Sequence, residues 1–203
     1  DARPSGNLAF HINSFKFPDD EAEALHNVHF ELKQGETLGI VGKTGSGKTT
    51  ILKLLMREFE GYDGSIHFGE HSIDEYRKTK LREAIGYVPQ DHFLFSSTIY
   101  NNIAFTNPNA AKEDVEHAAS VAYIHDDICT FTDGYKTVVG ERGVSLSGGQ
   151  KQRISIARAV MMKPELLMLD DSLSAVDAKT EEAILEALKK ERENATTIIT
   201  SHR

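Results

Sequence analysis

Hydrophobic and polar residues follow two patterns along the chain. Near the start they alternate as in half-buried strands, over residues 8–12, 15–17 and 24–33. Short apolar runs typical of strands buried on both faces follow at residues 37–41, 84–88, 166–169 and 196–200. We therefore expect an antiparallel sheet in the first third, joined by a short strand at residues 65–68, and a second, mainly parallel sheet.

Helical periodicity occupies most of the intervals between the buried strands. Apolar residues recur at helical spacing from residue 51, over 74–83 and 111–125, after residue 150, and from 178 to about 192. Asp177 is suited to cap the last helix. Strands alternating with helices predict an α/β fold with a mainly parallel sheet, which binds ligands outside the carboxyl ends of its strands.

The strand at residues 37–41 leads into the segment GKTGSGKT at residues 42–49, which opens the first helix. This order and the spacing G-x-x-x-x-G-K-[ST] are typical of a phosphate-binding loop. Glycines let the backbone aim its N–H groups at phosphate oxygens, and the helix dipole adds attraction. Lys48 would reach the β- and γ-phosphates, and Thr49 would offer its hydroxyl to Mg²⁺. A chance glycine-rich turn is the alternative, but the full spacing favours a nucleoside triphosphate site.

Composition and charge are those of an ordinary globular domain. The 203 residues are 39% hydrophobic and 27% charged, with a formal net charge of −8. The acidic balance argues against a surface that binds nucleic acid. The single Cys129 cannot form an internal disulfide, which fits a reducing compartment. No apolar run approaches the roughly 20 residues that cross a bilayer and no secretory signal is visible, so a membrane role would need a partner or another part of the protein.

Two further segments extend the nucleotide site. The apolar run at residues 166–169 ends in Asp170, a carboxylate that can hold Mg²⁺ beside the phosphate loop; capping of the next turn is its alternative role. The segment LSGGQ at residues 146–150 places Ser147 at a helix start, a second anion-binding helix terminus. One triphosphate cannot easily touch both termini within a monomer, but a dimer can clamp it between the loop of one chain and the Ser-Gly-Gly of the other.

These motifs, in this order, resemble the nucleotide-binding domain of an ATP-binding-cassette (ABC) transporter, most closely the exporter type. The resemblance covers residues 8–203. It identifies residues 42–49 as Walker A, 146–150 as the signature motif, 166–170 as Walker B, 174–177 as the D-loop and 139–143 as the exporter-type X-loop. It implies a P-loop, RecA-like core at about 37–90 and 162–203. An antiparallel β subdomain is expected at about 8–36 and 62–69, and a helical subdomain at about 91–161.

The resemblance also implies ligands and roles. ATP and Mg²⁺ are the expected cofactors, with Thr49, Gln90 and Asp170 as metal-binding residues. Asp171, His202, Gln90 and Lys48 are the expected catalytic residues. Phe17 stands where an aromatic ring stacks on adenine, usually a Tyr, although Phe17 could instead be a core residue. The residues expected to contact the nucleotide are Phe17, Gly42, Lys43, Thr44, Gly45, Ser46, Gly47, Lys48, Thr49, Thr50, Ser147, Gly148, Gly149 and Gln150.

The sequence departs from the family at Asp171, where the usual residue is a Glu that polarises the attacking water. Asp is one methylene shorter, and a misplacement of about 1 Å can cost on the order of 10²-fold in rate. We expect Asp171 to leave ATP binding intact and to weaken hydrolysis, as in the degenerate half of a heterodimeric exporter. A harmless conservative change in a homodimer and an engineered change are the alternatives.

The expected partners are a second nucleotide-binding domain, in a heterodimer or a homodimer, and the coupling helices of a transmembrane domain. The expected location is the cytoplasmic face of a cell or organelle membrane. We also expect the protein to extend beyond Arg203, because the chain stops just past an apolar strand. A non-transport ABC ATPase acting on DNA or ribosomes is the alternative function, disfavoured by the acidic charge and the lack of a long basic or coiled-coil insertion. A kinase or GTPase would not explain residues 146–150.

Overall fold

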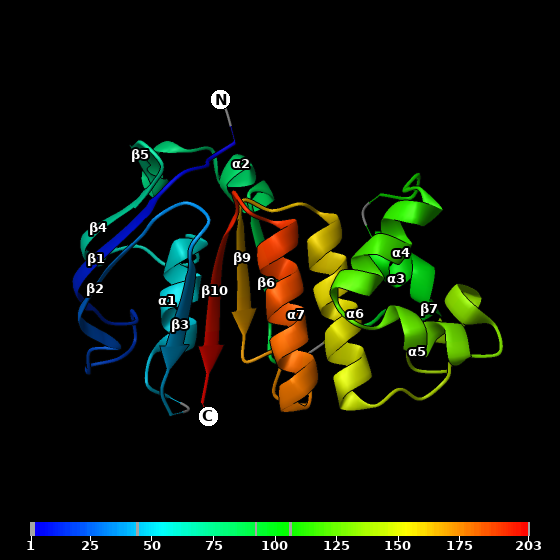
Figure 1. The fold of residues 1–203 in the computed structure, drawn as a ribbon. Helices are drawn as coiled ribbons and strands as arrows, with labels where there is room; N and C mark the ends of the chain where they lie inside the picture. The colour runs from blue at the N-terminus through cyan, green and yellow to red at the C-terminus, as the bar shows by residue number, and fades with distance from the viewer. Residues whose placement is uncertain (1–2, 44, 92, 106, 203) are drawn as a thin grey trace. The chain divides into compact units, whose positions relative to one another are not determined.

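The computed structural model describes residues 3–43, 45–91, 93–105 and 107–202. The chain forms two compact units (Figure 1). The first comprises Asp1–Tyr87, Pro164–Asp170 and Asn194–Arg203, and the second comprises Val88–Lys163 and Asp171–Glu193. The expected division into three subdomains stays a prediction. No helix among the described residues combines the length and the apolar character that a membrane span needs.

The first unit begins with the expected antiparallel sheet, in the order β2-β1-β4-β5. Its central strand β1 (Leu8–Phe15) pairs with β2 (Leu25–Leu32) on one side and with β4 (Asp63–Phe68) on the other; the edge strand is β5 (His71–Ser72). The predicted alternation is visible in β1, where Phe10 and Ile12 are buried and His11 between them is half-exposed.

The other sheet of this unit has the order β3-β10-β9-β6. The inner strands β10 (Thr196–Ser201) and β9 (Leu166–Asp170) run parallel to each other, and β10 runs parallel to β3 (Thr37–Val41). β6 (Ile85–Val88) is the other edge strand. The helices of the first unit are α1 (Lys48–Leu55), η1 (Ile73–Glu75) and α2 (Lys78–Glu83). This arrangement confirms the α/β fold class predicted from the sequence.

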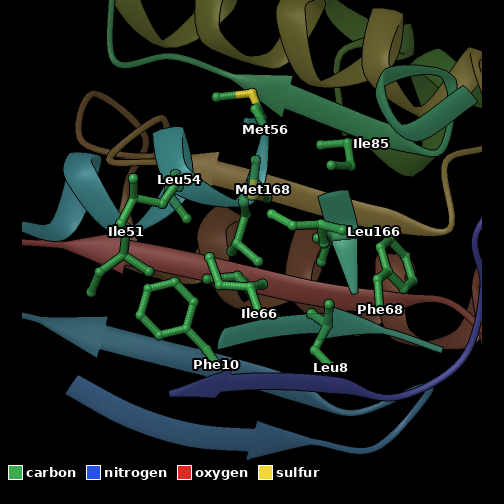
Figure 2. Close-up of a cluster of buried hydrophobic side chains, with 14 of the residues drawn as sticks. Leu8, Phe10, Ile51, Leu54, Met56, Ile66, Phe68, Ile85, Leu166 and Met168 are labelled. Atoms are coloured by element: carbon green, nitrogen blue, oxygen red, sulfur yellow. The ribbon is translucent and has the colours of Figure 1, made fainter. Parts of the chain in front are cut away.

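The hydrophobic core of the first unit joins its two sheets through α1 (Figure 2). Phe10 and Ile66 reach from the antiparallel sheet toward Ile51 of α1 and Met168 of β9. All four side chains are at most 6% exposed. Burial of such side chains stabilises a fold by about 1.5–3 kcal/mol each. The loop before α1 is therefore held by a helix that is anchored on its apolar face.

The second unit is mainly helical. Its central helix α6 (Gly148–Met161) is contacted by α3 (Ile99–Ala104) and α4 (Lys112–Val121), and α4 also contacts α7 (Ala178–Glu191). A two-stranded sheet pairs β7 (Ser97–Thr98) with β8 (Val138–Val139). The remaining elements are α5 (His125–Thr130) and η2 (Gly134–Lys136). Asp177 caps α7 as predicted, since its carboxylate accepts the N–H of Thr180 over 2.8 Å.

Two predicted helices are wrong in extent. The helix expected over 74–83 is divided by Tyr76 and Arg77, which are extended. The carbonyl of Tyr76 accepts from Nη1 of Arg57 over 2.8 Å, so a tertiary contact takes the place of a helical hydrogen bond.

The helix expected over 111–125 ends at Val121, and α5 begins at His125. Tyr123 is left-handed with φ +57°, its N–H bonds the carbonyl of Ser120, and the N–H of Ile124 bonds the carbonyl of Ala119. This is the Schellman ending that usually has a glycine at the left-handed position. With tyrosine there, the sequence carries no stop signal.

Candidate functional site

The phosphate loop connects β3 to α1 as the sequence predicted. It is pinned to the parallel sheet by the N–H of Gly42, which donates to the carbonyl of Ser201 over 3.1 Å. Gly45 and Gly47 adopt φ of +86° and +98°, a region that side chains disfavour, so the loop needs glycine at both positions. Gly47 is the N-cap of α1. The Nζ of Lys48 donates to the carbonyl of Gly42, which holds the ammonium group over the loop.

The remaining predicted loop residues surround this turn. Ser46 donates its backbone N–H to the carbonyl of Lys43 over 3.0 Å. Lys43 and Ser46 are exposed, and Thr50 is half-buried in the first turn of α1. Thr44 lies outside the described residues.

The loop also packs closely on the start of β2. A Cβ on Gly47 would lie 2.8 Å from Cδ2 of Leu25 and 3.1 Å from the carbonyl oxygen of Ala24. The N–H of Ala24 in turn donates to the carbonyl of Phe15 over 2.7 Å. The strand that precedes Phe17 is therefore hydrogen-bonded to Ala24, which lies next to Gly47 of the phosphate loop.

Phe17 itself is half-buried. Its ring packs edge-on against Phe15, with centroids 5.2 Å apart, and against Phe59, with centroids 5.0 Å apart. These contacts match the core role that the sequence left open. Stacking on a base stays a prediction.

Asp170 is the last residue of β9, and its carboxylate accepts hydrogen bonds from three hydroxyl groups. Its Oδ1 accepts from Thr200 over 2.8 Å and from Thr49 over 3.4 Å, and its Oδ2 accepts from Tyr87 over 2.7 Å. The carboxylate is buried, with 6% of the residue exposed. A buried charge is tolerated when hydrogen bonds satisfy it, and these three donors do so.

Tyr87 contributes to this arrangement as a fixed donor. Burial raises the pKa of its hydroxyl well above the ordinary value, and the hydrogen bond and charge of Asp170 raise it further. The phenol therefore keeps its proton throughout the physiological range.

The oxygens of Thr49 and Asp170 fit a hard divalent cation. Mg²⁺ binds through one or two protein oxygens and through phosphate oxygens, and the two groups already approach within 3.4 Å at the start of α1. Their donor chemistry and their closeness to Lys48 suit a magnesium–triphosphate complex. The sequence missed Tyr87 and Thr200, although Thr200 could have been found as a polar residue at the end of a buried strand.

The signature segment forms a complete capping box in the second unit. The hydroxyl of Ser147 accepts the N–H of Gln150 over 3.1 Å, and Oε1 of Gln150 accepts the N–H of Ser147 over 3.0 Å. Gln150 also donates to Asp127 over 3.3 Å. The Gln150 side chain thus fixes the start of α6, whereas Ser147 and Gly148 are exposed.

Close packing requires a glycine at position 149. A Cβ there would lie 2.7 Å from the backbone oxygen of Ala175, whereas a Cβ on Gly148 would meet Ala175 at an ordinary 3.4 Å. Nearby, the buried Gln152 donates to Oγ of Ser174 over 3.0 Å and accepts the N–H of Ala175 over 2.9 Å. The signature helix and the expected D-loop therefore form one hydrogen-bonded structure, which sequence reasoning missed.

Arg153 ties α6 to the preceding segment. It donates to Oδ2 of Asp127 over 2.9 Å, to the carbonyl of Tyr123 over 2.5 Å and to the carbonyl of Gly149 over 3.1 Å. This cluster could not be predicted from local sequence patterns, because the partners of Arg153 are up to 30 positions away.

The other predicted catalytic residues, Gln90, Asp171 and His202, each follow the end of a different strand. Gln90 is exposed after β6, and Asp171 is half-buried after β9; both belong to the second unit. Asp171 is left-handed with φ +53°, a conformation that Asp adopts more readily than most residues. His202 belongs to the first unit and is exposed directly after β10. Their catalytic roles stay predictions.

A parallel sheet, a glycine-rich loop before α1 and a carboxylate at the end of β9 define a P-loop nucleotide-binding protein. The family model described as "ABC transporter" matches residues 25–174, and the chain belongs to this family. The chain matches the ATP-binding part of ABC transporters, and the relatives below include a solved exporter structure.

Two of the curated relatives are bacterial proteins whose names refer to multidrug resistance. The chain is 48% identical over 203 residues to the "Probable multidrug resistance ABC transporter ATP-binding/permease protein YheI" of Bacillus subtilis, covering all of this chain and 35% of that protein. It is 48% identical to "Multidrug resistance-like ATP-binding protein MdlA" of Escherichia coli, covering 98% of this chain and 34% of that protein. The chain thus spans about a third of the length of these relatives.

A solved structure supports the same assignment. The "Structure of a bacterial Atm1-family ABC exporter with ATP bound" matches 99% of this chain and 35% of that one, with a TM-score of 0.88 and 40% identity. This likeness and the family match confirm the family resemblance that the motifs indicated.

Proposed function

We propose that the chain is the Mg²⁺-dependent ATPase domain of an exporter, which pairs with a second nucleotide-binding domain and drives transport through attached membrane domains. The observation that carries the proposal is the approach of Thr49 to Asp170 at the start of α1, beside Lys48. The name of the Bacillus subtilis relative, which describes an ATP-binding/permease protein, supports the link to transport.

In this proposal the phosphate loop binds the triphosphate through its backbone N–H groups, and Lys48 turns from the carbonyl of Gly42 to the phosphates. Thr49 and Asp170 hold Mg²⁺, which neutralises phosphate charge when bound. Tyr87 and Thr200 keep the Asp170 carboxylate oriented. Phe17 supports the adenine ring.

The proposal includes a partner that supplies a signature segment. Ser147, Gly148 and Gly149 stand at the start of α6, and Ser147 and Gly148 are exposed. A helix N-terminus attracts phosphate, so this surface suits the γ-phosphate of a nucleotide bound by the partner. His202 and Gln90 would contact the γ-phosphate and the attacking water in the chain's own site.

Asp171 makes the chain's own site slow in this proposal. Its side chain is shorter than the usual Glu, and its φ of +53° is a conformation that Asp tolerates better than Glu does. The exporter is then a heterodimer, in which Ser147 and the two glycines complete the faster site on the partner.

Steady-state ATP turnover of the protein, alone and with its partner, tests this proposal. We expect Asp171→Glu to raise turnover in this chain's site and Asp171→Asn to abolish the residual rate, with ATP affinity unchanged in both. Fast hydrolysis by the unmodified chain alone would contradict the degenerate site. Turnover stimulated by DNA or ribosomes, and not by a partner transporter subunit, would contradict the transport function.

A further inference from the structure

The outer face of the antiparallel sheet carries two neighbouring histidines. In the register of β1 and β2, His11 stands directly opposite His29. Because Phe10 and Ile12 on either side of His11 point into the core, the His11 ring points to the outer face. The side chains of residues paired in this way are close enough to interact.

The two rings approach each other through their Nδ1 atoms. Nδ1 of His11 lies 3.2 Å from Nδ1 of His29, and the ring centroids are 5.4 Å apart. Two imidazole nitrogens that bind one tetrahedral metal ion at about 2.0–2.1 Å are about 3.3 Å apart. The observed separation therefore matches that of two ligands of one ion, with little change in the backbone.

A carboxylate orients one of the rings. Oε1 of Glu31 lies 3.5 Å from Nε2 of His11, the nitrogen on the far side of the ring. A carboxylate at this distance favours the tautomer with its proton on Nε2, which leaves the lone pair on Nδ1, where the second histidine approaches. Metal-binding histidines in proteins commonly have such a carboxylate on their other nitrogen.

We propose that His11 and His29 bind a divalent transition-metal ion of the Zn²⁺ class on this face, with water as the further ligands. Imidazole nitrogen suits Zn²⁺, Ni²⁺ and Cu²⁺ and does not suit Mg²⁺. Without metal, one ring donates its Nδ1 proton to the other ring. On metal binding, His29, which is exposed, loses its Nδ1 proton to solvent and takes up one proton from solvent on Nε2, so the ring changes tautomer with no net proton release.

The site has two protein ligands, because the described residues contain no group of three or more His, Cys, Asp or Glu side chains placed to hold an ion. Its ligands come from separate strands, so a bound ion links β1 to β2. β1 leads toward Phe17, and β2 begins at Leu25, next to Gly47 of the phosphate loop. Metal therefore stabilises the sheet that holds one side of the nucleotide site.

Calorimetric titration with ZnCl₂ at pH 7.5, without nucleotide or Mg²⁺, tests the site. All variants carry Cys129→Ser, because Sγ of Cys129 lies 3.6 Å from Nε2 of His125 and offers a competing pair of ligands. We expect one zinc ion per chain. Either His11→Ala or His29→Ala should lower the affinity more than tenfold, and Glu31→Gln should lower it by up to about tenfold.

The matched control is His71→Ala, which removes a similar carboxylate–imidazole pair, since Nδ1 of His71 lies 2.9 Å from Glu75 and its neighbouring ring is Tyr76. It should leave zinc affinity unchanged. Zinc should also raise the midpoint of thermal unfolding in the parent and not in His29→Ala. Equal zinc affinity in the parent and in His29→Ala, or a loss as large in His71→Ala, would overturn the proposal.

Discussion

The hydroxyl of Tyr87, at the end of β6, donates to Oδ2 of Asp170 at the end of the neighbouring strand β9 over 2.7 Å. Thr200 and Thr49 share the other oxygen of this carboxylate. The carboxylate is therefore fixed in rotation from both sides, and the oxygen near Thr49 faces the start of α1. A metal-binding carboxylate fixed in this way loses little conformational freedom when it binds an ion.

Tyr87→Phe should therefore weaken magnesium binding without removing it. A hydrogen bond to a charged group contributes about 1.5–3 kcal/mol, so we expect a rise of roughly tenfold or more in the Mg²⁺ concentration needed for nucleotide binding. Titration of Mg²⁺ against a fluorescent ATP analogue measures this. Tyr100→Phe is the control, because its hydroxyl donates to the carbonyl of Ala110 instead; an equal effect of both variants would contradict the role of Tyr87.

Gly148 and Gly149 should differ in how they tolerate alanine. A Cβ at position 149 would overlap the backbone oxygen of Ala175 at 2.7 Å, whereas at position 148 the nearest contact is 3.4 Å. We expect Gly149→Ala to destabilise the protein by about 1–3 kcal/mol and Gly148→Ala to change the free energy of unfolding by less than about 0.5 kcal/mol. Urea unfolding of both variants measures the difference, and equal stabilities would show that the D-loop can shift at no cost.

The sequence allowed a correct prediction where a structural motif is made of consecutive residues. The phosphate loop and the helix starts at Ser147 and Asp177 are local patterns, since each needs only a turn and its cap. Tyr87 and Asp170 are 83 positions apart and meet because β6 and β9 are neighbours in the sheet. A single sequence does not determine this strand order, so Tyr87 could not be predicted as a donor to Asp170.

The ends of two helices were predicted wrongly for a similar reason. Tyr123 takes the left-handed position that glycine usually marks, and the extended Tyr76 gives its carbonyl to Arg57. In both cases tertiary contacts override local propensity. The break at Tyr123 also allows its carbonyl to accept from Arg153 of the signature helix.

Asp177 should make the start of α7 sensitive to acid. Hydrogen bonds from the N–H and hydroxyl of Thr180 lower the pKa of this carboxyl below its ordinary 3.8. A lowered pKa in the folded state stabilises the protein fully above pH 3.8 and progressively less as the pH falls toward the folded-state value.

Asp177→Asn separates this charge effect from capping, because Asn caps helices about as well. We expect the parent to have the higher urea midpoint near neutral pH and the difference to shrink as the pH falls below about 3.8. Ser147, whose cap is uncharged, supplies the control, since Ser147→Ala should cost about the same at each pH. A constant difference between parent and Asp177→Asn would show that the carboxylate charge contributes nothing.

Arg158 contacts the segment around α3 that contains Phe93, Phe95 and Phe105. Its guanidinium donates to the carbonyl and side-chain oxygens of Asn102 over 2.8 and 3.0 Å, and to the carbonyl of Phe93 over 2.9 Å. Its charged carbon lies 4.9 Å from the ring centre of Phe95 and 5.4 Å from that of Phe105. Burial lowers the pKa of this group, yet it stays cationic at neutral pH.

Arg158→Lys should loosen this segment although it keeps the charge. An ammonium group cannot make the planar set of three bonds, so at least one buried acceptor loses its donor, at about 1–3 kcal/mol. We expect faster hydrogen exchange in Ile99–Ala104, by roughly tenfold or more, with α7 unchanged. Arg142→Lys, at an exposed position, should leave exchange as it is. Unchanged protection in Arg158→Lys would mean that α3 is held by apolar packing alone, since Ile99 and Ile103 are fully buried.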